Sequence, residues 1–65
     1  MAVQLTLIGG EKVTVKHDGG GSDFIDLLND DTHPQHNGRY LYVQRDDDGK
    51  WVWVNTESIG WVQEA

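Results

Sequence analysis

The chain has 65 residues, with 11 acidic and five basic side chains, a formal net charge of −6 and no cysteine. A chain of this length buries only about 60% of its unfolded surface on folding, so we expect one small domain over residues 1–65. The missing cysteines exclude disulfides and thiolate metal sites. The acidic charge opposes binding to nucleic-acid phosphates and anionic lipids, because both interactions depend on Lys and Arg.

Alternating apolar and polar side chains predict two strands at the start of the chain. Residues 3–8 and residues 12–17 both repeat with a period of two, which is typical of half-buried strands. Gly9 and Gly10 between them can adopt the positive φ angles of a tight turn. We therefore expect an antiparallel hairpin.

A short helix is predicted after the next run of glycines. Ser22 is a residue type that caps helices through its hydroxyl. Phe24, Leu27 and Leu28 then fall on one side of a helix that ends at Asn29. So short a helix is not stable alone in water, so its apolar side must pack on the sheet.

The second half of the chain predicts three more strands. We expect an exposed polar loop over residues 29–38, strands at 39–45, 51–55 and 59–63, and a tight corner at 56–58. The order β-β-α-β-β-β predicts a mainly β (α+β) fold, a five-stranded antiparallel SH3-like or Sm-like barrel with one short helix, because closure removes exposed strand edges. An open sheet with the helix on one face is the alternative.

The run Trp53-Val54-Asn55, followed by a short corner and then Ile59 and Val62, resembles a known group. It is similar to short SH3-like β-barrel proteins from phages, prophages and bacterial accessory genes, over Arg39 to Glu64. This resemblance implies a small barrel without catalytic residues, in a group whose functions are mostly unknown. The same segment is loosely similar to small flagellar proteins, but the insert at 30–38 and the density of tryptophan depart from them.

The segment between Tyr40 and Val54 carries large apolar or aromatic side chains on both faces of a hairpin. A three-residue loop with a bulge at Gly49 places Val43 opposite Trp53 and Tyr42 opposite Val54, whereas a two-residue turn places Val43 opposite Val54. We favour the bulged loop, because three aspartates before a glycine suit a type I turn. Either register leaves neither face polar.

One face of this hairpin is expected to pack into the domain, so the other needs a partner. Tyr and Trp are enriched where interfaces concentrate their binding energy. We therefore predict a non-enzymatic protein-binding module that forms a homo-oligomer, binds another protein, or does both. The candidate interface residues are Tyr40, Tyr42, Trp51, Trp53 and Trp61.

The candidate catalytic pattern is incomplete. His17, Asp18 and Ser22 have the residue types of a nucleophile, its base and an orienting acid. The glycines between them would hold these groups loosely, whereas catalysis needs close positioning. We expect no enzymatic activity and no cofactor.

Two patterns suggest metal ligands, and neither is complete. His33 and His36 follow Asp30 and Asp31, but Pro34 keeps the backbone between the two rings extended and spreads them apart. The acidic run at 46–49 lacks the flanking helices and the central glycine of a helix-loop-helix calcium site. We predict solvated histidines, a hairpin turn and no metal site.

Two alternatives to protein binding remain open. One is a small-ligand binder with sites between subunits. The other is an acidic mimic of nucleic acid that uses the clustered carboxylates Asp23, Asp26, Asp30, Asp31 and Asp46 to Asp48.

The expected location is the cytoplasm. No apolar run approaches the roughly 18 residues of a membrane span, and the first residues lack the basic start and apolar stretch of a secretory signal. We expect neither a membrane partner nor direct binding to nucleic acid.

Overall fold

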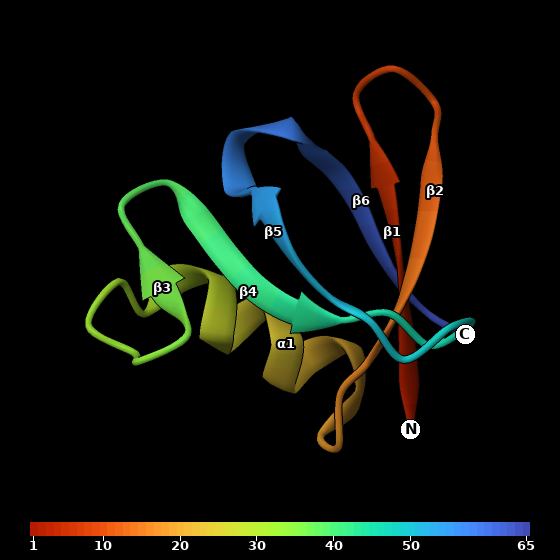
Figure 1. The fold of residues 1–65 in the computed structure, drawn as a ribbon, viewed down its shortest axis with the longest axis horizontal. Helices are drawn as coiled ribbons and strands as arrows, with labels where there is room; N and C mark the ends of the chain where they lie inside the picture. The colour runs from red at the N-terminus through yellow and green to blue at the C-terminus, as the bar shows by residue number, and fades with distance from the viewer.

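The computed structural model describes all residues from Met1 to Ala65 and is mainly β with one helix, as the sequence predicts (Figure 1). A two-residue strand is present in addition to the expected elements. In chain order the elements are β1 (Ala2–Leu7), β2 (Lys12–Lys16), α1 (Gly20–Asn29), β3 (His36–Asn37), β4 (Tyr40–Gln44), β5 (Trp51–Asn55), the 3-10 turn η1 (Thr56–Ser58) and β6 (Ile59–Glu64).

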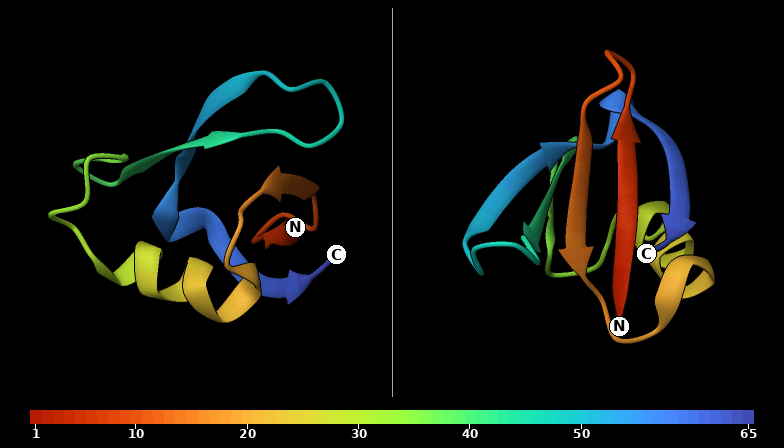
Figure 2. Two further views of the ribbon diagram at one scale, coloured as in Figure 1. Left: turned by 90° about the horizontal axis from the view of Figure 1, so that it is seen from below. Right: turned by 90° about the vertical axis from the view of Figure 1, so that its right-hand side faces the viewer.

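The first sheet has the strand order β2-β1-β6, and all neighbours are antiparallel. The right-hand view of Figure 2 shows β1 between its two partners. Leu5 lies opposite Val13 on β2 and opposite Val62 on β6. Val3, Leu5 and Val15 have no exposed surface, so the alternation predicted for the first hairpin is confirmed.

The second sheet has the order β3-β4-β5, and its main hairpin has a register that the sequence did not predict. The Arg45 amide donates to the Lys50 carbonyl at 2.8 Å, which closes a four-residue loop. Val43 consequently lies opposite Val52. Both expected registers, with Val43 opposite Trp53 or Val54, are wrong.

The loop is longer than expected because its first residue bonds to the other sheet. The Asp46 amide donates to the Thr14 carbonyl of β2 at 2.9 Å and is thereby held out of the hairpin ladder. The Lys50 amide then donates to the Asp48 carboxylate at 3.0 Å. Gly49, with a φ of 72°, takes the left-handed position that completes the turn.

This register separates the two kinds of apolar side chain completely. Tyr42 lies opposite Trp53, and Leu41 lies opposite Val54. Because cross-strand partners share a face, the aliphatic residues point inward and the aromatic residues point outward. Leu41, Val43 and Val54 are buried, and the prediction of a hairpin with two apolar faces is confirmed.

The two sheets do not close into a barrel. One isolated bridge, between Val15 and Arg45, joins the β2 edge to the end of the second hairpin. The closed five-stranded barrel is therefore not confirmed: β2 and β5 both lie at the edge of their sheets, and of these two only β2 is joined to the other sheet, by this bridge. The left-hand view of Figure 2 shows the β4–β5 hairpin standing apart from the first sheet.

The helix begins at Gly20 with its N-cap at Gly19, three residues before the predicted cap Ser22. Ser22 is exposed and caps nothing, and Gly19 at the N-cap position has no side chain to do so. The Glu64 carboxylate of β6 accepts instead from the Gly21 amide at 2.6 Å. The expected packing is confirmed, because α1 contacts β1 and β6 and buries Phe24.

The segment at residues 29–38 is more ordered than a simple exposed loop. Its strand β3 pairs His36 with Leu41 of β4. The Nε2 atom of His36 also lies 2.7 Å from the Leu27 carbonyl, so the segment is attached to the end of α1.

The helix α1 has 10 residues, too few for a membrane-spanning helix.

Candidate functional site

Four exposed aromatic side chains gather on the outward side of the β4–β5 hairpin, and we name them the aromatic face. Tyr42 stands between two indoles. Its ring centroid lies 5.0 Å from that of Trp51, with the planes at 22°, and 4.6 Å from that of Trp53, with the planes at 39°. The aromatic face consists of Tyr40, Tyr42, Trp51 and Trp53.

The aromatic face follows from the period of the two strands. Successive side chains of a strand alternate between its faces, so Tyr40 and Tyr42 share one side, as do Trp51 and Trp53. The observed register then brings both pairs to the same side. The rings cover one another only in part, because Trp51 and Trp53 are still 50% and 51% exposed.

A hollow lies at each end of the aromatic face, and the sequence did not predict that the polar residues lining these hollows lie beside the rings. Asn37 lines a hollow of 300 Å³ beside Tyr40 and Trp53. At the other end, Trp51 borders a hollow of 470 Å³. Its other lining residues lie between the end of β2 and the first turns of α1, or are glutamines: Lys16, His17, Asp18, Gly19, Asp23, Gln35 and Gln44. No spacing in the sequence indicates these neighbours, since they come from separate segments.

Trp61 does not join the aromatic face. It lies on β6 in the other sheet, opposite Thr6, and is 72% exposed. None of the aromatic ring pairs includes it. The five residues expected to form one interface are thus divided into a group of four and a single indole.

His17, Asp18 and Ser22, which have the residue types of a catalytic set, do not form a hydrogen-bonded group. The His17 Nε2 atom lies 2.7 Å from the Asp23 carboxylate, and its ring meets Phe24 edge-on at 5.2 Å. This places His17 in a structural contact at the start of α1, without a bond to Asp18 or Ser22.

The histidines of the β3 segment also hold structural positions. The Nδ1 atom of His33 accepts from the Gln35 amide at 3.2 Å, whereas His36 contacts the end of α1. No group of three histidine or carboxylate side chains comes together as metal ligands would.

Two aspartates have a lowered pKa, each for a local reason. The Thr32 hydroxyl and amide both donate to the Asp30 carboxylate, and these bonds hold its pKa below the ordinary value. The Arg45 guanidinium donates to the Asp47 carboxylate at 2.9 Å and lowers the pKa of that group. Because their pKa is lowered, both groups are ionised at neutral pH, and because they are exposed, they contribute to the acidic surface.

Comparisons with known proteins bring no relative to this chain: no family model matches it, and neither the curated proteins nor the solved structures contain a significant match.

Proposed function

We propose that this chain is a non-enzymatic protein-binding module that associates with a second copy of itself through the aromatic face. The observation that carries the proposal is the stack of Trp51, Tyr42 and Trp53 on the outward side of a hairpin whose inward side already fills the core. The rings therefore stack on one another and take no part in the core. Rigid aromatic groups of this kind supply much of the energy in protein interfaces.

The size of the aromatic face predicts a weak association. The four residues are between 36% and 51% exposed, so they present on the order of 400 Å² to solvent. A patch of this size is often functional, yet it is about half of what one partner buries in a standard interface of roughly 800 Å² per side. We therefore expect a dimer that forms and dissociates over micromolar to millimolar concentrations.

A second copy is the favoured partner because the domain has a small core. Eight apolar residues form that core, whereas eight large hydrophobic side chains remain exposed. A small domain gains in stability when a copy covers such surface. Two aromatic faces related by a two-fold axis would also bring rings against rings without placing a charge between them.

We further propose that the fold is an opened SH3-like barrel, as the resemblance over residues 39–64 suggests. Its support is the central position of β1 between β2 and β6, together with the 3-10 turn that joins β5 to β6. The single bridge from Val15 to Arg45 lies where a closed barrel would continue its ladder.

The test is the mass of the protein in solution as a function of concentration, measured by sedimentation. The double variant Trp51→Thr/Trp53→Thr removes both indoles of the stack and keeps residues that favour strands. Trp61→Thr is the control, because it removes an even more exposed tryptophan that lies outside the aromatic face.

We expect wild type and Trp61→Thr to dimerise with similar constants, and the double variant to remain a monomer. Circular dichroism of each variant establishes that the fold is retained. A wild-type chain that stays monomeric up to about 1 mM, or equal loss of association in the Trp61→Thr control, would refute the proposal.

One observation favours a second candidate, the acidic mimic of nucleic acid. Asp23 and Asp26 lie on the same side of α1, and together with Asp30, just beyond the end of the helix, they border a hollow of 230 Å³. Competition of the chain with an oligonucleotide for a basic DNA-binding protein tests this role. The triple variant with Asn at these positions should lose the competition, whereas Asp31→Asn should keep it.

A further inference from the structure

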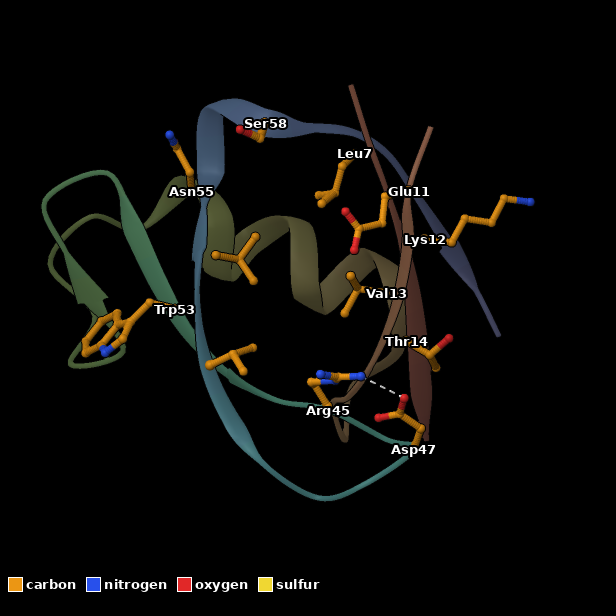
Figure 3. A pocket seen from close by; sticks show the side chains of 12 residues that line it. Leu7, Glu11, Lys12, Val13, Thr14, Arg45, Asp47, Trp53, Asn55 and Ser58 are labelled. Atoms are coloured by element: carbon orange, nitrogen blue, oxygen red, sulfur yellow. Dashed lines mark hydrogen bonds and ion pairs between the residues drawn. The ribbon is translucent and has the colours of Figure 1, made fainter. Parts of the chain in front are cut away.

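A groove separates the β1–β2 hairpin from β5 on the side of the molecule that faces away from α1 (Figure 3). Its volume is 440 Å³, which is within the usual range of ligand pockets. Leu7 and Val13 point into it from the first sheet, and Val52 and Val54 line it from β5. Leu7, Val13 and Val52 are only half-buried, so the floor of the groove is apolar and partly uncovered.

The wall formed by β5 is a free strand edge with unpaired main-chain groups. The ladder to β4 is bounded by hydrogen bonds from Arg45 to Lys50 and from Thr56 to Arg39. Because hydrogen-bonded pairs alternate along an antiparallel ladder, Val52 and Val54 direct their amides and carbonyls toward β4. The main-chain groups of the three alternate residues, Trp51, Trp53 and Asn55, point away from β4 and have no hydrogen-bond partner.

We propose that this groove binds an extended segment of another polypeptide, which adds as a strand to the free edge of β5. An apolar floor beside unpaired donors and acceptors matches the two sides of an extended chain. Its backbone can bond to the edge, while every second side chain enters the groove. The segment would span about five residues, the length of β5, with small aliphatic side chains at alternate positions.

The charges along the groove restrict the composition of the segment that can bind there. Glu11 and Asp47 lie along the groove, and Arg45 is already bonded to Asp47 at 2.9 Å. Lys12 is the other cation of the groove lining, and the whole chain carries a net charge of −6. A neutral or basic segment therefore fits the groove, whereas an acidic segment would be repelled.

A single segment fits this groove better than the edge of a second copy does. The groove has a wall on each side, β5 on one and the β1–β2 hairpin on the other, as Figure 3 shows. A strand that belongs to a folded sheet brings its neighbouring strands with it, and these would meet the β1–β2 wall. The site is also separate from the aromatic face, because the Trp53 side chain points away from the groove.

The probe is a seven-residue peptide of alternating threonine and valine with a lysine at each end, titrated into the full chain. The measurement is hydrogen exchange at single amides, followed by NMR. In the free protein the amides of Trp51, Trp53 and Asn55 should exchange much faster than those of Val52 and Val54. The peptide should slow the exchange of the first three at least about tenfold at saturation.

Two controls separate strand addition from other contacts. The same peptide with N-methyl groups on its alternate amides keeps the side chains but loses the backbone donors, so it should not protect the β5 edge. In the protein, Val13→Thr should weaken binding about fivefold. Its matched control is Val62→Thr, which alters the other cross-strand neighbour of Leu5 outside the groove and should bind as wild type does.

Three results would overturn the proposal. The first is no protection at about 5 mM peptide, and the second is equal protection by the N-methylated peptide. The third is protection of Trp51, Trp53 and Asn55 in the free protein that increases with protein concentration, because a second copy would then occupy the edge. The Trp51→Thr/Trp53→Thr variant keeps the main chain of the β5 edge, so it should still bind the peptide even where it no longer dimerises. Failure of the groove proposal is thereby distinguished from failure of the aromatic face.

Discussion

The rings of Tyr42 and Trp53 lie directly opposite one another across the β4–β5 hairpin, with their centroids 4.6 Å apart on the exposed side. One residue earlier on β4, Leu41 lies opposite Val54 on the buried side. Two adjacent rows of the same hairpin thus belong to different environments. Substitutions in the two rows should therefore have different consequences.

The first prediction contrasts these rows in stability. Leu41→Ala removes a fully buried side chain and should lower the free energy of unfolding by about 2–5 kcal/mol. Trp53→Ala removes a half-exposed ring and should cost about 1 kcal/mol, mostly through the lost stacking on Tyr42. Urea unfolding followed by circular dichroism measures both. A larger loss for Trp53→Ala than for Leu41→Ala would contradict the observed packing.

The second prediction tests the register of the hairpin with an engineered disulfide. Gln44 and Trp51 form a non-hydrogen-bonded pair, whose Cα atoms are about 4.5 Å apart in such ladders. The variant Gln44→Cys/Trp51→Cys should therefore oxidise readily, and the chain has no cysteine to interfere.

The control for this test is Gln44→Cys/Trp53→Cys, the pair that a two-residue turn would bring together. In the observed register these residues are diagonal neighbours at about 7–8 Å, so the bond should form poorly. Mass spectrometry under equal oxidising conditions measures both yields. A higher yield in the control would show that the register is wrong.

Periodicity was sufficient to predict the five longer strands and to pair the aromatic residues within β4 and within β5. It did not predict that both pairs share one side, because that depends on the register of the hairpin. Each strand of the sequence alternates in a way that depends only on its own residues, and that alternation places Tyr40 with Tyr42 and Trp51 with Trp53 in any register. The sequence did not determine which aromatic residues belong to the core, because that also depends on the register.

Contacts between distant segments account for what the sequence did not reveal. The length of the hairpin loop depends on the bond from Asp46 to Thr14, which are 32 positions apart in the chain. The start of α1 depends on Glu64, whose carboxylate arrives from the last strand. The sequence favoured Ser22 as the cap because capping propensity depends only on residues near the helix end. This propensity contains no information about a carboxylate from a distant strand.

The third prediction concerns acid stability. The pKa of Asp30 and that of Asp47 are lowered in the folded chain, so the folded state favours the ionised carboxylates. Their stabilising contribution is complete above the unfolded value of about 3.9 and is lost as the pH falls through the lower folded pKa. The melting temperature should therefore decrease as the pH is lowered below about 4.

Salt distinguishes the two aspartates in this experiment. Asp47 is held by the Arg45 guanidinium, so the difference in melting temperature between wild type and Asp47→Asn at neutral pH should shrink in about 1 M salt. Asp30 is held mainly by hydrogen bonds from Thr32, so the corresponding difference for Asp30→Asn should change less. Both differences should shrink as the pH falls below about 4, and differences that stay constant through this range would contradict the assignment.

The last prediction concerns the carboxylate that caps α1 from β6. Glu64 accepts a hydrogen bond from the Gly21 amide at 2.6 Å, at the helix end where the peptide dipoles favour negative charge. Glu64→Ala should cost about 1–2 kcal/mol and lower the melting temperature by roughly 4–8 °C per kcal/mol in a domain of this size. Glu64→Gln keeps an acceptor without the charge and should recover part of that loss. Gln63→Ala, next to it on the same strand and exposed, should change the melting temperature little, so equal losses at both positions would rule out the cap as the cause.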